Sequence, residues 1–132
     1  IQKRLNELHH FKLLLERLQQ VRPQATVVGL GDFNLSLVNT KGKRFDSELI
    51  PVEFFKSKPK IIGLIKEPTT IGGSNYDHFF YFENGRCLPL VDSAKVLFDH
   101  GSMSQERRAE YYKEVSDHFP VRVEFDLDCV NK

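Results

Sequence analysis

The chain has 132 residues, of which 40% are hydrophobic and 28% are charged, and its formal net charge is +1. This composition is typical of a soluble globular domain or part of one, and it excludes an intrinsically disordered chain. The near-neutral charge gives no electrostatic sign of a nucleic-acid binder, although an enzyme that holds phosphate through a metal does not need a basic surface.

The sequence leaves the cellular compartment open. No apolar run approaches the length of a membrane span, so no span is expected. No signal peptide is visible, but residue 1 is Ile within a helical pattern, and we therefore expect the gene to start upstream. Cys87 and Cys129 match no zinc-binding spacing; they are compatible with one disulfide, but two free thiols are the simpler interpretation.

The first third of the chain predicts a helix followed by a strand. Residues 1–22 carry apolar side chains at steps of three and four, which indicates an amphipathic helix, and Pro23 ends it. Residues 26–30 are a β-branched apolar run that predicts a buried strand. Gly31-Asp32-Phe33-Asn34 follows its end, where ligand sites of open α/β sheets are commonly found.

The middle of the chain, residues 35–75, has a less regular pattern. We expect a short helix within 46–55 and a loop over 69–75. Two basic clusters are either contacts for a nucleic-acid backbone or solvated loop charges, and the low net charge favours the second interpretation. The clusters are Lys41, Lys43 and Arg44, and Lys56, Lys58 and Lys60.

The last part of the chain predicts further strands and one helix. Residues 76–82 are rich in aromatic side chains and indicate a strand, after which Asn84-Gly85 indicates a hairpin turn. The returning strand is expected within 86–98. Residues 105–114 are charged and favour a helix, and residues 119–125 alternate between apolar and polar as a half-buried strand does.

Three polar clusters stand beside predicted strands: Gly31–Asn34, Tyr76–His78 and Ser116–Val121. They offer carboxylates for a hard cation, an amide for an oxyanion and an imidazole for proton transfer. Phosphodiester hydrolysis needs these parts, because the attacking water must lose a proton and the charge on the phosphoryl oxygens must be stabilised. Each cluster alone is more simply interpreted as a turn or as ordinary core or surface residues. His78 should face the opposite side of its strand from Asp77.

In this order along the chain, the clusters resemble motifs of the endonuclease/exonuclease/phosphatase (DNase I-like) family. Gly31-Asp32-Phe33-Asn34 is similar to the central motif of that family, and Ser116-Asp117-His118-Phe119-Pro120-Val121 is similar to its last motif. The Tyr76-Asp77 pair looks most like the deoxyribonuclease branch. The predicted helix at residues 1–22 stands where the family places one before its central motif, and the resemblance covers roughly residues 1–126.

The resemblance implies roles for five side chains. Asp32 would orient or deprotonate the attacking water or lie near the metal, and Asn34 would donate a hydrogen bond to a phosphate oxygen. His118 would contact the scissile phosphate as an acid or a base, while Asp77 would bond to the other ring nitrogen of His118 and raise its pKa. Asp117, together with Asp32, would bind the divalent cation, which is expected to be Mg²⁺, with Mn²⁺ or Ca²⁺ as substitutes.

The resemblance also implies an α/β fold over residues 1–132, the C-terminal half of a DNase I-like α/β sandwich with a mixed, mostly antiparallel sheet backed by helices. The asparagine, glutamate and second histidine of the family's first half have no counterpart here. We therefore expect the missing N-terminal half or a second chain to complete the fold, and a bare apolar sheet face without it.

The expected function is a metal-dependent phosphodiester hydrolase, an endonuclease acting on DNA or on another phosphodiester substrate. Two alternatives stay open at this point. One is a phosphatase or phospholipid phosphodiesterase of the same family, because substrate choice lies in loops rather than in the fold. The other is an inactive half-domain that acts as an interaction module.

Overall fold

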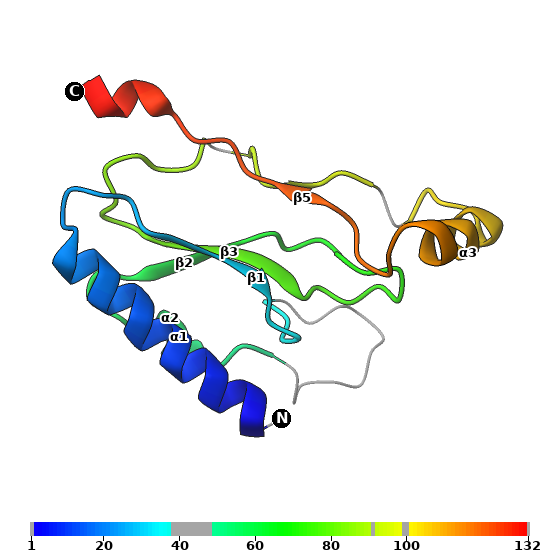
Figure 1. Cartoon of the computed structure of the whole chain (residues 1–132), viewed down its shortest axis with the longest axis horizontal. Coiled ribbons are helices and arrows are strands. Elements are labelled where there is room, and N and C mark those ends of the chain that lie inside the picture. Colours follow the sequence, from blue (N-terminus) through cyan, green and yellow to red (C-terminus); the bar gives the residue numbers. More distant parts are fainter. Residues whose placement is uncertain (1, 38–48, 91, 99–100, 132) are drawn as a thin grey trace.

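The computed structural model describes residues 2–37, 49–90, 92–98 and 101–131 (Figure 1). Three predictions fall outside these residues: Ile1 of the first helix, the basic cluster at 41–44, and positions 46–48 of the expected short helix. Within the described ranges, no helix combines the length and the apolar character needed to cross a membrane.

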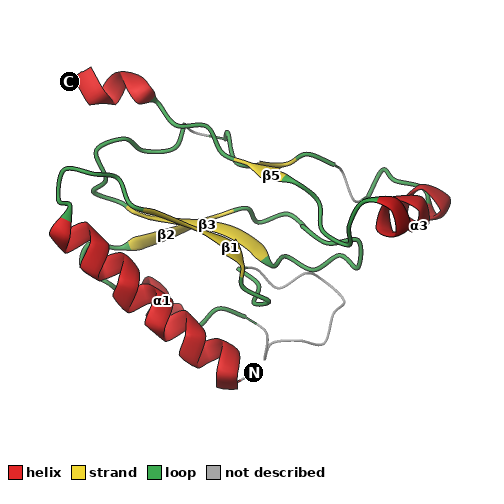
Figure 2. Cartoon of the chain, in the orientation of Figure 1, coloured by secondary structure: helices red, strands yellow, loops and turns green. Residues whose placement is uncertain are grey.

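The fold is mixed α/β with two small antiparallel sheets (Figure 2), which confirms the predicted class and the mainly antiparallel pairing. The first sheet has the order β1-β3-β2, with strands β1 (Val28–Asp32), β3 (Asp77–Phe82) and β2 (Ile61–Leu64). The second sheet pairs β4 (Lys95–Val96) with β5 (Val121–Arg122). The helices are α1 (Gln2–Val21), α2 (Val52–Phe55), α3 (Gln105–Glu114) and a 3-10 helix at Leu127–Asn131.

Helix α1 packs along one face of the first sheet, on the side away from β5 in Figure 1. Its apolar stripe buries Leu8 and Leu15, as the periodicity predicts. Gly29 of β1 lies beneath the helix, and the ring of Phe11 occupies the space that a side chain at this position would need. The absence of a side chain at Gly29 therefore sets how closely α1 approaches the sheet.

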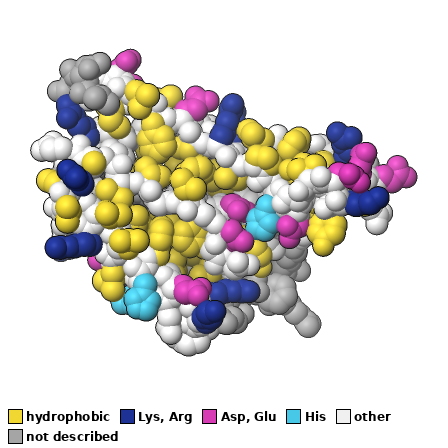
Figure 3. Space-filling view, in the orientation of Figure 1, with side chains coloured by type: hydrophobic (Ala, Val, Ile, Leu, Met, Phe, Trp, Pro, Cys, Tyr) yellow, Lys and Arg dark blue, Asp and Glu magenta, His cyan; other side chains and the backbone are white. Residues whose placement is uncertain are grey.

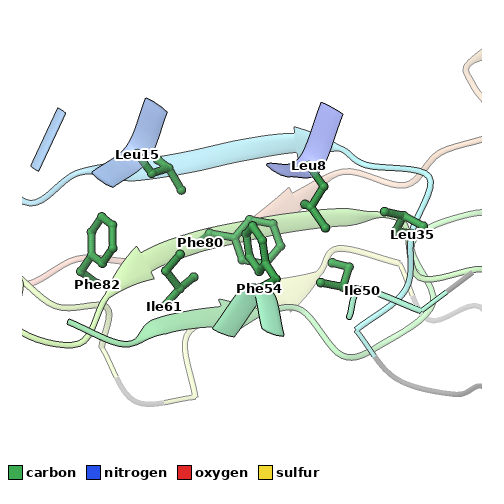
Figure 4. Packing of buried hydrophobic residues seen from close by; sticks show 8 residues of the cluster. All are labelled: Leu8, Leu15, Leu35, Ile50, Phe54, Ile61, Phe80 and Phe82. Atoms are coloured by element: carbon green, nitrogen blue, oxygen red, sulfur yellow. The ribbon is translucent and has the colours of Figure 1, made fainter. Parts of the chain in front are cut away.

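The core lies between the helices and the sheet, around Phe80 of β3 (Figure 4). Phe80 is fully buried, and its ring centroid lies 4.9 Å from those of Phe33 and Phe54. Burial alternates along β3, with His78, Phe80 and Phe82 buried and the residues between them half-buried. This alternation confirms that His78 and Asp77 point to opposite faces. Each buried aromatic ring stabilises the fold by roughly 1.5–3 kcal/mol through removal from water.

The sheet face opposite α1 is only partly covered. Leu30 pairs with Phe79 across β1 and β3, points away from α1 because Gly29 faces that helix, and is 66% exposed. Figure 3 shows hydrophobic side chains gathered on this view of the molecule. Leu30 therefore leaves apolar surface exposed on this face.

The predicted hairpin after β3 is wrong. The chain does turn there, since the Gly85 N–H donates to the carbonyl of Phe82 at 3.0 Å, but the segment that follows leaves the sheet. β2, which lies in the irregular middle of the sequence, pairs with β3 instead. The expected strand over 86–98 is reduced to β4, and that over 119–125 to β5 and isolated bridges. Long-range pairing selected the partner of β3, and local turn chemistry did not.

Two smaller expectations also change. The short helix expected within 46–55 is limited, in the described residues, to the four residues of α2. Cys87 and Cys129 form a disulfide with their Cα atoms 5.4 Å apart, so the interpretation as two free thiols is wrong. The bridge follows from the tertiary pairing of these segments, where the Leu90 N–H donates to the Glu124 carbonyl at 2.8 Å. Such a pairing cannot be read from two isolated cysteines.

Candidate active site

Asp32 and Asp77 lie directly opposite each other at the ends of β1 and β3. Two carboxylates in such a cross-strand position repel each other unless a cationic group lies between them. His118 supplies that group when its ring is protonated: its Nδ1 is 2.8 Å from Asp77 Oδ2, and its Nε2 is 3.8 Å from Asp32 Oδ2. Figure 3 shows acidic side chains around a histidine on this face. The structure thus brings together three of the five predicted site residues.

The hydrogen bond to Asp77 fixes the tautomer of His118. Because a carboxylate only accepts, Nδ1 carries the hydrogen, and Nε2 of the neutral ring presents its lone pair towards Asp32. Partial burial lowers the pKa of His118, but the hydrogen bond and charge of Asp77, and the charges of Asp32 and Asp117, outweigh burial and raise the pKa above its usual value. Nε2 is therefore suited to exchange a proton near neutral pH.

Thr69 holds the segments that carry Asp77 and His118 close to each other. Its carbonyl accepts a hydrogen bond of 2.8 Å from the N–H of Phe119, the neighbour of His118. Its fully buried hydroxyl accepts from the N–H groups of Tyr76 and Asp77 at 3.0 and 3.1 Å. The Thr69 side chain thus fixes the start of β3, and the Thr69 backbone fixes the loop that carries His118.

Asn75 supports the same region from within the core. It is fully buried, and its amide donates to the carbonyls of Ile65 and Glu67 at 2.8 and 2.6 Å, while its oxygen accepts from the Leu37 N–H at 3.0 Å. The sequence indicates only a loop over 69–75, because Thr, Gly, Ser and Asn are ordinary loop residues. A threonine and an asparagine just before Tyr76 are the only sequence signal for these positioning residues.

Asn34 lies beside the Asp77–His118 pair, and its side chain points towards Asp32. It adopts φ 50°, in the left-handed region that asparagine tolerates better than most residues. Its backbone N–H donates to Asp32 Oδ1 at 2.9 Å and its side-chain amide to Asp32 Oδ2 at 3.3 Å. Arg4 of α1 holds the Asn34 carbonyl at 3.2 Å. A rotation of the Asn34 side chain is needed before its amide can reach a phosphate.

A hollow of about 460 Å³ opens next to Asn34. The first turns of α1 line it together with residues 32–34, so a ligand held at Asp32 has space on this side. Arg4 brings a cationic group to its wall, and Phe11 and Phe33 bring aromatic surface.

Asp117 projects into solvent next to the pair. The Ser116 hydroxyl accepts from the His118 N–H at 3.0 Å, which forms the turn that presents Asp117. Among the described residues, no set of three or more His, Cys, Asp or Glu side chains converges as a metal site. Mg²⁺ commonly binds proteins through only one or two carboxylates and keeps several waters, and the oxygens of Asp32 and Asp117 have the donor chemistry it prefers.

His78 does not belong to this site. It is buried on the helix-facing side of β3, and its Nε2–H donates to the carbonyl of Leu35 at 2.7 Å. Burial lowers the pKa of His78, so the ring is held neutral as part of the core.

In comparisons with known proteins, the chain matches no protein-family model, no curated protein and no solved structure.

Proposed function

We propose that this chain carries part of the active site of a metal-dependent hydrolase that cleaves phosphodiester bonds, with DNA as the substrate and endonucleolytic cleavage as the reaction. The observation that carries the proposal is the position of His118 between Asp77 and Asp32. His118 and Asp77 are 41 residues apart in sequence, and each belongs to a motif that resembles the DNase I-like family.

The geometry supports different roles for the carboxylates of Asp32 and Asp77. Asp32, which is 38% exposed, orients a water molecule and accepts its proton as the water oxygen attacks phosphorus. The bond from phosphorus to the leaving oxygen breaks, and that oxygen takes the proton of Nε2 of the His118 imidazolium. Asp77 keeps the ring oriented through Nδ1. Proton transfer from Asp32 to Nε2, across 3.8 Å, then restores both groups.

In this proposal Asp117 would hold the divalent cation, Mg²⁺ or, as substitutes, Mn²⁺ or Ca²⁺, close to Asp32. The cation would neutralise negative charge on the phosphoryl oxygens. The asparagine, glutamate and second histidine of the family's site would come from an N-terminal half or from a second chain. Asn34 would donate to a phosphate oxygen after releasing Asp32.

The test is a nicking assay on supercoiled plasmid DNA with Mg²⁺, using the full-length protein. Asn34→Ala and His118→Ala should each lower the rate at least 100-fold, which is the scale of a lost oxyanion donor or general acid. Asn84→Ala and His9→Ala, which change the same residue types away from the site, should leave the rate unchanged. Unchanged rates in both site variants would contradict the proposed roles.

Assays of the same protein on other substrates decide the substrate class. RNA, inositol phosphates and sphingomyelin are assayed beside DNA, because this fold does not fix the substrate. Cleavage of a lipid or a phosphomonoester with no cleavage of DNA would replace the nuclease by the phosphatase or phospholipid phosphodiesterase. No cleavage of any substrate would favour the interaction module.

Metal binding is tested without relying on activity. Mn²⁺ should broaden the NMR signals of Asp32 and Asp117 before those of two acids outside the site, Asp92 and Asp126. Equal broadening of all four would contradict a metal site at the pair.

A further inference from the structure

A groove of about 470 Å³ runs along the outer edge of β2, which is the edge strand at the other end of the sheet from β1. Ile61, Ile62 and Gly63 all line it. Because consecutive residues of a strand face opposite sides of the sheet, a space lined by all three lies at the strand edge rather than on one face.

The backbone of β2 offers hydrogen-bonding groups to this groove. The Glu83 N–H donates to the Lys60 carbonyl at 2.9 Å, which places Lys60 at a hydrogen-bonded position of the β2–β3 ladder. Since such positions alternate in antiparallel pairs, the N–H and carbonyl of Ile61 and Gly63 point away from β3. Among the strands and bridges formed by the described residues, none pairs with this edge. An open edge of this kind accepts an added strand.

The wall of the groove is apolar. Leu37, Phe55 and Val52 line it, and Val52 of α2 is 64% exposed. Leu37 packs over Gly63, with its side chain 2.8 Å from where a Cβ at Gly63 would stand. The groove thus presents aliphatic and aromatic surface next to the open backbone groups of β2.

The rim of the groove is cationic. Lys56, Lys60 and Lys66 line it and are exposed, and none of the acidic residues that the structure describes lines it. Within the described residues, none of the three lysines forms an ion pair. Glu83 accepts from the backbone N–H of Lys60 at 3.3 Å and Glu67 from that of Val96 at 3.4 Å, and neither carboxylate forms an ion pair with a lysine of the rim. The groove therefore complements a negatively charged partner.

We propose that this groove binds an extended acidic segment of a partner protein, which adds a strand to the edge of β2. The open N–H and carbonyl groups of Ile61 and Gly63 would pair with the partner backbone, and alternate side chains would meet the apolar wall. The lysines would face carboxylates of the partner and favour its encounter and register. A nucleic-acid strand or a lipid surface complements the lysines but leaves the row of backbone groups unpaired.

The proposal is tested with a fluorescein-labelled eight-residue peptide of alternating Val and Glu. Fluorescence anisotropy should show saturable binding to the full chain, and hydrogen exchange should slow at the amides of Ile61 and Gly63. Lys60→Glu with Lys66→Glu should weaken binding about tenfold or more, as loss of complementary charge predicts. The matched control, Lys95→Glu with Lys113→Glu, changes two exposed lysines outside the groove and should bind as the native chain does.

Several results would overturn the proposal. A peptide of alternating Val and Lys that binds equally well would remove the role of charge. Peptide binding without slower hydrogen exchange at the amides of Ile61 and Gly63 would contradict strand addition. A DNA oligonucleotide or a phosphatidylserine vesicle that displaces the peptide and binds more tightly would assign the groove to that ligand. Val52→Asp changes an exposed residue of the apolar wall and should weaken peptide binding. Peptide binding as tight as that of the native chain would show that the apolar wall does not contribute.

Discussion

The Cys87–Cys129 disulfide gives a quantitative test of how the second sheet is held to the fold. The bridge spans 42 residues of sequence, and this segment contains α3 and both strands of the second sheet. A cross-link of this span restricts the unfolded chain and stabilises the folded state by about 4 kcal/mol at 25 °C on the chain-entropy relation. We expect Cys87→Ala with Cys129→Ala to lower the free energy of unfolding by this amount and the melting temperature by roughly 10–20 °C.

Urea unfolding followed by circular dichroism measures this difference. Dithiothreitol should weaken the native protein to the level of the double variant and leave the variant unchanged. The pKa of His118, measured by NMR in the folded variant, should not move, because Thr69 and Asp77 hold the ring independently of the bridge. A loss below 1 kcal/mol, with the bridge confirmed in the native protein by mass spectrometry, would refute the entropic reasoning.

Three further predictions concern the site and the core. Asp77→Asn removes the carboxylate that raises the pKa of His118, so the pKa should fall, and the alkaline limb of the pH–rate profile, which reports loss of the imidazolium, should move to lower pH. The raised pKa also stabilises the native fold below the unfolded-state value of about 6.5, and this stabilisation is lost as pH rises through the folded value, so Asp77→Asn should destabilise more at pH 6 than at pH 9. Thr69→Val leaves buried N–H groups without an acceptor and should cost roughly 1–3 kcal/mol in urea unfolding. Gly29→Ala forces the ring of Phe11 to move and should cost roughly 1–3 kcal/mol.

Each of these variants has a matched control. Asp126→Asn removes an acid away from the site and should leave the pKa of His118 unchanged. Thr69→Ser keeps the hydroxyl and should restore most of the stability. Gly72→Ala places its Cβ 3.9 Å from the nearest neighbour and should be tolerated. If a variant and its control behave alike, the contact assigned to that residue does not act as described.

Local patterns predicted the proximity of Asp32, Asp77 and His118 better than they predicted the sheet. Asp32, Asp77 and His118 were recognisable because each lies in a short polar cluster beside an apolar run. Thr69 and Asn75 could not be recognised in this way, because their hydrogen bonds run to segments whose proximity depends on the fold. Asn34 was recognised, but its contact with Asp32 depends on a left-handed backbone conformation that the sequence allows without requiring.

The sequence by itself determined the long helix α1, the helix α3, the aromatic strand β3 and the α/β class, because each follows from the pattern of apolar, aromatic and charged side chains over a few residues. The tertiary structure decided the partner of β3, the pairing of the cysteines and the position of the imidazole between two carboxylates. These depend on contacts between segments tens of residues apart, where the burial of Phe80 and its neighbours outweighs the preference of any single turn.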